Sequence, residues 1–141
     1  MAIYRLLGQP GAANFTTAMA LYEFANQGVE WAIIETGMGG RLDSTNVITP
    51  AVSVITPIGL DHRGKLGDTL EQIAREKAGI IKPATPVITG VTQPEPLNVI
   101  REVAAENGCR LLALGRDFDT ACLAETVRIC RDCGIVTMFD I

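Results

Sequence analysis

The chain contains 141 residues, of which 48% are hydrophobic and 20% are charged, and its formal net charge is −4 at pH 7. This length suits one domain with a core of its own, and this apolar content excludes an intrinsically disordered chain. The acidic balance, without a basic cluster, argues against sequence-independent binding of nucleic acid, and no apolar run approaches the roughly 20 residues that span a bilayer. Because no signal-peptide pattern opens the sequence, we expect a cytoplasmic protein without nucleic-acid or membrane partners.

The hydrophobic pattern predicts alternating helices and strands. Helical spacing begins near Asn14 and ends at Gly28, and a β-rich run follows directly over residues 29–36. Further strands are predicted over 51–56, 87–89 and 110–114, and further helices over 69–79 and 94–108. Short apolar runs bounded by turn residues are typical of parallel strands that are covered on both faces. We therefore predict an α/β fold with a three-layer, doubly wound, mostly parallel sheet.

The last third of the chain carries all four cysteines, at positions 109, 122, 130 and 133. Without a secretory signal these cysteines are predicted to be reduced thiols. The Cys130-x-x-Cys133 pair resembles half of a zinc site, but no second pair and no histidine accompany it, so we interpret the pair as unrelated cysteines. After residue 119 the pattern weakens to a possible helix over 120–131 and a possible strand over 134–139.

A loop rich in glycine and polar residues follows the first predicted strand. Three glycines lie within residues 37–40, and they permit close approach of the backbone to a ligand. The loop continues with a dense set of hydrogen-bonding side chains, namely Arg41, Asp43, Ser44, Thr45 and Asn46. An ordinary connection between strands does not need so many polar groups, so the loop is a candidate binding site.

Three other polar residues are expected at the same edge of the sheet. Glu35 ends the first strand run, His62 follows the second, and Lys77 lies on the apolar side of the 69–79 helix. Ligands of open parallel sheets bind outside the carboxyl ends of the strands. Each residue alone also has a structural explanation: a solvent-facing acid, a hydrogen-bonding histidine and a lysine that extends its charge into water. The functional alternatives are that Glu35 binds Mg²⁺ through its carboxylate, that His62 belongs to a functional loop, and that Lys77 is a desolvated nucleophile.

The segment from Gly59 to Lys65 matches a phosphate-binding loop except at its last position, where Leu66 replaces the serine or threonine that would bind Mg²⁺. We interpret this match as a coincidence. A nucleotide-binding domain that uses this segment remains a weaker alternative.

Taken together, three strings closely resemble the folylpolyglutamate synthase/dihydrofolate synthase family, which is related to the Mur ligases. They are ETGMGGRLDSTN from Glu35, ITPIGLDH up to His62, and EKAGIIKP from Glu76. The resemblance covers about residues 15–118. It implies a central ATPase domain with a fold like that of P-loop NTPases, and an ATP-dependent, ADP-forming amide ligase of folate metabolism. Such a ligase adds L-glutamate to dihydropteroate, to folates or to both through an acyl phosphate.

The resemblance also implies roles for individual residues. Glu35 and His62 match residues that hold Mg²⁺ at the ATP phosphates, and Lys77 matches a lysine that these ligases carbamylate, which turns it into a further metal ligand. His62 and Lys77 are therefore the predicted catalytic residues. Asp43 and Ser44 match loop positions that contact the pterin in bifunctional members of the family. Arg41, Thr45 and Asn46 are predicted to shape the same substrate-binding loop.

The sequence also departs from the family pattern. No phosphate loop of the family type occurs in residues 1–30, and residues 120–141 lack the resemblance. We also expect the C-terminal domain of the family to be missing. We therefore expect residues 1–119 to form an incomplete central domain, which is a truncated product or one piece of a split enzyme that needs a completing segment or subunit. The rival hypothesis is a non-catalytic remnant that binds nucleotide, metal or a partner.

Overall fold

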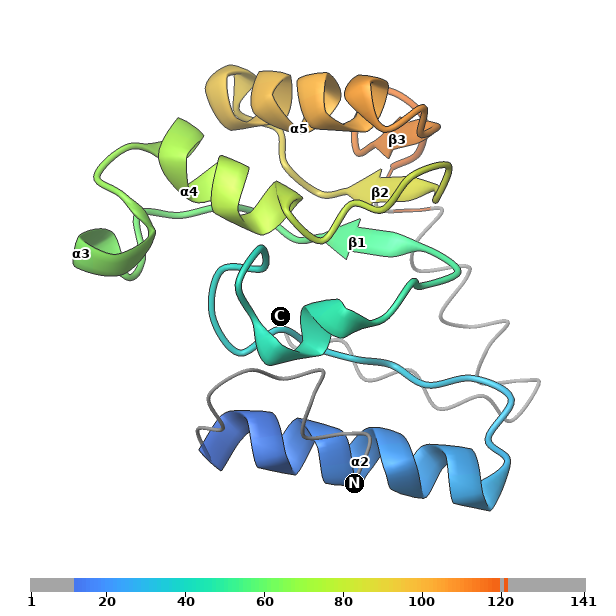
Figure 1. Cartoon of the computed structure of the whole chain (residues 1–141). Helices are drawn as coiled ribbons and strands as arrows, with labels where there is room; N and C mark the ends of the chain where they lie inside the picture. Colours follow the sequence, from blue (N-terminus) through green and yellow to red (C-terminus); the bar gives the residue numbers. More distant parts are fainter. Residues whose placement is uncertain (1–11, 120, 122–141) are drawn as a thin grey trace.

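The computed structural model describes residues 12–119 and residue 121. Its N-terminal part is helix α2 (Ala12–Gln27), which is followed by an extended segment and the 3-10 helix η1 (Ser44–Val47). The remaining elements are, in chain order, β1 (Ser53–Ile55), α3 (Arg63–Leu66), α4 (Leu70–Ala78), β2 (Val87–Thr89), α5 (Pro94–Glu106) and β3 (Leu111–Ala113). Figure 1 shows η1 between α2 and the sheet. Apart from residue 121, the elements predicted over 120–131 and 134–139 lie outside the described residues.

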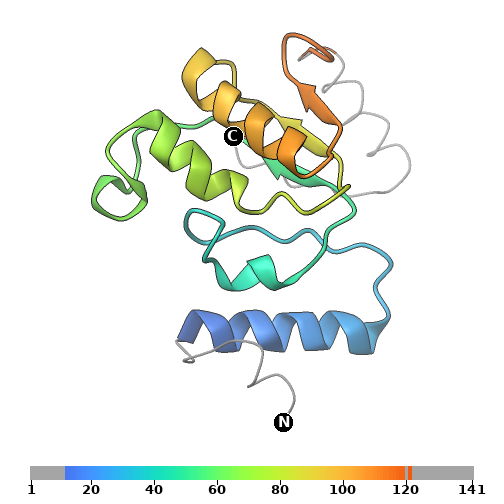
Figure 2. The same cartoon turned by 45° about the horizontal axis from the view of Figure 1, so that its top comes forward.

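The three strands form a parallel sheet in the order β1-β2-β3. Val54 pairs in register with Ile88, and Ile88 with Leu112. Parallel neighbours need a crossover connection, which α4 supplies between β1 and β2 and α5 supplies between β2 and β3. These two helices pack side by side against the sheet (Figures 1 and 2). The predicted parallel α/β fold is therefore confirmed.

The hydrophobic core lies between the sheet and helices α4 and α5. Successive side chains of a strand point to opposite faces, and Ile55, Val87 and Ala113 are the buried members that belong to this core. The two helices contribute Ile73, Ala74, Ala78, Ile100 and Ala104, among others. Val54 lies on the opposite pleat of β1 and is 53% exposed, so the far side of the sheet is open there.

Helix α4 begins and ends where its sequence predicts. Thr69 accepts a hydrogen bond from the backbone N–H of Gln72 at 3.3 Å, and the Gln72 side chain accepts one from the N–H of Thr69 at 3.2 Å. This reciprocal capping box satisfies two N–H groups that a helix start leaves without partners. The helix stops before Gly79. Its C-terminal end brings the backbone of Lys77 close to Gly40 in the glycine-rich loop.

The strand predicted over residues 29–36 is wrong. These residues form no strand in the structure, and the side chains of Trp31 and Ile33 are 79% and 77% exposed. A strand exists only when a neighbour accepts and donates its hydrogen bonds, and β1 pairs with β2 on one side while its other edge has no partner among the described residues. The β-forming sequence is present, but residues 29–36 hydrogen-bond neither to the open edge of β1 nor to another described strand, so no strand forms there.

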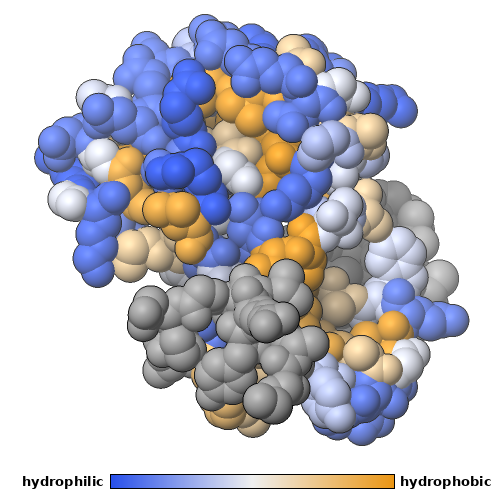
Figure 3. Space-filling model, viewed as in Figure 1, coloured by the Kyte–Doolittle hydropathy of each residue, from blue (hydrophilic) through white to orange (hydrophobic). Residues whose placement is uncertain are grey.

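Helix α2 has apolar residues on more than one side. Its inner side contacts η1, where the hydroxyls of Thr17 and Ser44 are 2.9 Å apart. Phe15, Met19 and Tyr22 follow at helical spacing on another side, and each is more than half exposed. Figure 3 shows hydrophobic side chains reaching the surface in several patches. No helix in the described ranges is long and apolar enough to cross a membrane.

Candidate active site

The glycine-rich loop is organised by the carboxylate of Asp43. One oxygen accepts hydrogen bonds from the backbone N–H groups of Gly37 and Met38 at 3.0 and 3.1 Å. The other oxygen accepts from the backbone N–H and the hydroxyl of Thr45 at 2.9 and 2.6 Å. Partial burial acts to raise the pKa of the Asp43 carboxyl, but these hydrogen bonds outweigh it and hold the pKa below the ordinary value of 3.8. Asp43 therefore shapes the loop as a charged hub and also caps η1.

The loop is attached to the C-terminal end of α4 through Arg41. The backbone N–H of Arg41 donates to the carbonyl of Glu76 at 2.8 Å, and its guanidinium donates to the Glu76 carboxylate at 2.9 and 3.1 Å. Gly40 lies so close to this helix end that an added Cβ would be 2.9 Å from the carbonyl oxygen of Lys77. The glycine at position 40 is thus what lets the loop touch the turn that carries Lys77.

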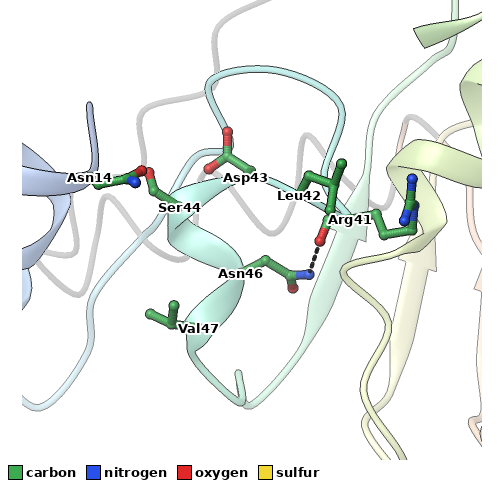
Figure 4. Close-up of a pocket in the computed structure, with 7 residues that line it drawn as sticks. All are labelled: Asn14, Arg41, Leu42, Asp43, Ser44, Asn46 and Val47. Atoms are coloured by element: carbon green, nitrogen blue, oxygen red, sulfur yellow. Dashed lines mark hydrogen bonds between the residues drawn. The ribbon is translucent and has the colours of Figure 1, made fainter. Parts of the chain in front are cut away.

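Asn46 forms a second attachment between the loop and the end of α4. Its side-chain amide donates to the carbonyl of Gly79 at 3.0 Å. The same amide donates to the carbonyl of Arg41 at 3.1 Å (Figure 4). Its own carbonyl accepts a hydrogen bond from the Lys82 ammonium at 2.8 Å. A helix leaves its last carbonyl groups without intrahelical partners, and the loop supplies donors for two carbonyls in this region.

An open pocket of about 250 Å³ lies beside the loop. Its walls come from η1, from the turn before it and from the start of α2, and Figure 4 shows their side chains around the hollow. The lining residues are Asn14, Arg41, Leu42, Asp43, Ser44, Asn46 and Val47. Four of the five predicted substrate-binding residues therefore line one pocket, and Thr45 lies in the same turn of η1.

The other three predicted site residues occupy separate positions. Glu35 is exposed at the end of the extended segment and forms no hydrogen bond or ion pair with another described residue. His62 precedes α3 with a φ of 51°, a backbone conformation that costs energy for a residue other than glycine and that clusters at functional sites. Its ring Nε2 lies 3.6 Å from the Asp61 carboxylate. Lys77 lies in α4 and is half-buried.

The described residues contain no group of three or more His, Cys, Asp or Glu side chains that could hold a metal ion. No hydrogen bond or ion pair joins Glu35, His62 and Lys77 either, so a shared metal site for these three stays a prediction.

Sequence reasoning missed the partners of the loop. Glu76 was visible beside Lys77 but received no role, and Lys82 received none. An ion pair between residues 41 and 76 leaves no periodic signal in the sequence, because only the fold brings the two segments together. The density of polar residues over 41–46 was the only signal available, and it locates the loop rather than its contacts.

The fold and the loop together define a class of protein. The Mur ligase middle domain family matches residues 8–132, so the chain belongs to that family. The chain is 51% identical over 108 residues to the dihydrofolate synthase/folylpolyglutamate synthase of Bacillus subtilis, an alignment that covers 76% of this chain and 25% of that protein. The predicted resemblance is thereby confirmed.

Solved structures agree with these sequence relatives. A complex of a folylpolyglutamate synthase with AMPPCP and folate matches with a TM-score of 0.72 and 46% identity, over 74% of this chain and 26% of that one. The folylpolyglutamate synthase of Thermotoga maritima matches with a TM-score of 0.71 and 37% identity, over 84% of this chain and 29% of that one. The chain therefore spans about a quarter of the length of these relatives.

Proposed function

We propose that the chain supplies part of the active site of an ATP-dependent, ADP-forming amide ligase that adds L-glutamate to dihydropteroate, to folates or to both. The observation that carries this proposal is the 51% identity to a dihydrofolate synthase/folylpolyglutamate synthase. The three motifs of the resemblance, around Glu35, His62 and Lys77, all lie within residues 12–119. Two of them meet in the structure, because the loop after Glu35 contacts the helix end that carries Lys77.

In the proposed reaction a carboxylate oxygen of the pterin substrate attacks the terminal phosphorus of ATP, and ADP leaves. The amino nitrogen of glutamate then attacks the acyl carbon, inorganic phosphate leaves, and the nitrogen loses a proton as the amide forms. Charge builds up on phosphate oxygens in both steps, so catalysis depends mainly on positioning and on neutralising charge.

We assign the metal-binding part of this site to Glu35, His62 and Lys77. Proteins commonly hold Mg²⁺ through one or two carboxylates together with substrate phosphates. Glu35 offers an exposed carboxylate, and carbamylation would give half-buried Lys77 a second carboxylate-like group. Bound Mg²⁺ would neutralise phosphate charge during transfer.

We assign substrate binding to the pocket beside residues 41–46. Its walls are rich in amide, hydroxyl and charged groups, which suits a ligand that needs several directed hydrogen bonds. Because both oxygens of Asp43 are already bonded within the loop, we propose that Asp43 acts there by fixing the shape of the pocket. Ser44 and Thr45 are the hydroxyl-bearing residues of this turn.

We further propose that the site is completed by the segments that flank this region in the relatives, in one polypeptide or as a partner. The support is the exposure of the apolar side chains of Trp31, Ile33 and Val54, together with the edge of β1 that has no partner within residues 12–119. Sheets with parallel strands normally have both faces covered. The expected cytoplasmic location stays a prediction.

A chimera tests the ligase function. Residues 15–118 replace the corresponding region of the Bacillus subtilis relative, and ADP formation is measured with dihydropteroate or folate, ATP and glutamate. We expect an active chimera, and a loss of about 100-fold or more in kcat/KM for Glu35→Ala or Lys77→Ala. The matched control is Lys65→Ala, which belongs to the rejected phosphate-loop pattern and should leave the rate within about twofold of the chimera.

A folded chimera that forms no ADP, or one that Lys65→Ala inactivates, would contradict the proposed ligase. The first outcome would favour the non-catalytic alternative, and the second would favour a nucleotide-binding domain that uses the segment from Gly59 to Lys65. The isolated chain is expected to form no measurable ADP. Calorimetry with Mg²⁺-ATP on the isolated chain and on Glu35→Ala and His62→Ala then shows whether the metal-binding residues act without the flanking segments.

A further inference from the structure

The loop and the end of α4 are joined by more hydrogen bonds than an ordinary connecting loop needs. Arg41 contributes a backbone and a side-chain attachment to one residue, Glu76. Asn46 reaches the next turn of the chain at Gly79. Here "the loop clamp" means these three residues: Arg41, Glu76 and Asn46.

The clamp holds the segment that carries Lys77 from one side. The carbonyls of Glu76 and Gly79 flank Lys77 in sequence, and both accept hydrogen bonds from the loop. On the other side, the hydroxyl of Ser53 in β1 donates to the carbonyl of Ile80 at 3.1 Å. The end of α4 is therefore fixed between the sheet and the loop.

The geometry of the ion pair also favours a defined position over a loose surface contact. Exposed ion pairs usually contribute little because both side chains lose freedom in a solvent that screens them. The Glu76 side chain, however, is only 25% exposed, and Arg41 meets its carboxylate with two nitrogens, Nε and one terminal nitrogen. Such two-pronged contacts fix orientation as well as distance.

We propose that the loop clamp positions the glycine-rich loop over the helix end that bears Lys77, so that Arg41, Glu76 and Asn46 are positioning residues of the ligase site. Arg41 and Asn46 then serve the reaction through the backbone that they hold and not as direct ligands of the pterin. This inference rests on the function proposed above for its link to catalysis. The clamp itself is defined by contacts within residues 41–79.

Hydrogen exchange on the full chain tests the clamp directly. The amide at position 41 donates to Glu76 across the contact, whereas the amides of Val87 and Gly90 donate within the sheet region. We expect Arg41→Ala to accelerate exchange at position 41 by about tenfold while the amides of Val87 and Gly90 keep their rates. Glu76→Gln retains an oxygen acceptor and should give a smaller acceleration.

The matched control is Arg75→Ala, which changes the residue next to Glu76 in α4 and removes an exposed ion pair with Glu102 of α5. We expect it to leave exchange at position 41 unchanged. Acceleration of all amides together in Arg41→Ala would overturn the proposal, because the pair would then contribute only general stability. No acceleration at position 41 would overturn it as well.

The consequence for Lys77 is measured separately by NMR after addition of ¹³C-bicarbonate. A carbamate signal that Lys77→Ala removes reports carbamylation of this lysine, and we expect Arg41→Ala to lose most of that signal while the fold is retained. An undiminished signal in Arg41→Ala would overturn the positioning role. Absence of the signal from the unaltered chain would count against the ligase chemistry, and hydrogen exchange would still decide whether the clamp exists.

Discussion

At the scale of single residues, Asp43 links the pH dependence of stability to the shape of the pocket. Its pKa is held below 3.8, so its contribution to folding is fully present above that pH and is lost as the pH falls through the lower pKa of the folded state. We expect Asp43→Ala to reduce the free energy of unfolding by about 2–3 kcal/mol at neutral pH, because four donors lose a charged acceptor. Urea unfolding, monitored by circular dichroism, measures this change.

Two further variants separate the charge of Asp43 from general effects. Asp43→Asn keeps one acceptor oxygen, so it should lower the free energy of unfolding by less than Asp43→Ala at neutral pH. This decrease should become smaller still as the pH falls to about 3. Asp68→Asn changes an exposed carboxylate in the turn before α4 and should alter stability by less than about 0.5 kcal/mol. A difference between Asp43→Asn and the unaltered chain that stays constant with pH would contradict the role of the charge.

At the scale of elements, the contact between the loop and α4 depends on glycine at position 79. A Cβ added there would lie 2.6 Å from the Cα of Arg41, although the backbone φ of −62° is acceptable for alanine. Alanine favours helix by about 0.5–1 kcal/mol relative to glycine, but overpacking costs about 1–3 kcal/mol. We therefore expect Gly79→Ala to lower stability and to displace the loop.

The measurement for Gly79→Ala is thermal unfolding, combined with exchange at the amide of Arg41. Gly59→Ala is the matched control, since nothing lies within 4 Å of a Cβ added at that glycine. A Gly79→Ala chain that is as stable as the unaltered one, with an unchanged loop, would show that the two elements separate without cost.

Elements with a local signal could be predicted from the sequence. The helix predicted over 69–79 is present as α4, and the strand predicted over 87–89 is present as β2. The run over residues 29–36 has the same composition as a strand but forms none, because strand formation depends on a neighbour that the pattern cannot supply. The sequence pattern therefore predicts single elements, but it does not predict which strands pair with each other.

In the candidate site too, features formed by neighbouring residues could be predicted from the sequence, whereas contacts between distant residues could not. The polar density of residues 41–46 located the pocket, because those residues are close in the sequence and stay close in the fold. The partnership of Arg41 with Glu76 joins residues that the sequence separates, and only the packing of α4 against the loop reveals it. The proposed metal-binding role of Glu35, His62 and Lys77 stays a prediction, since neither the sequence nor the structure tests it.

At the scale of the whole molecule, the exposed apolar side chains of the described residues bear on how the proposed site is completed. Trp31 and Ile33 lie in the extended segment, and Val54 lies on the open side of β1. Burying a large apolar side chain stabilises a fold or a complex by about 1.5–3 kcal/mol. The isolated chain lacks this stabilisation for these three side chains, because they stay exposed. Such a surface favours association with another segment.

Trp31 is the only tryptophan in the chain, so its fluorescence reports whether this surface becomes covered. The side chain is 79% exposed, and we expect a red-shifted emission that acrylamide quenches readily. Adding the flanking segments of the Bacillus subtilis relative as a separate, tryptophan-free polypeptide should shift the emission to the blue and reduce quenching, because the indole leaves water. Ile33→Ser should weaken this association by about tenfold or more, since it replaces a large apolar contact, yet it should leave the isolated chain as stable as before, since Ile33 is 77% exposed there. Unchanged emission at saturating segment concentration, or equal association of Ile33→Ser and the unaltered chain, would mean that the completing surface lies elsewhere.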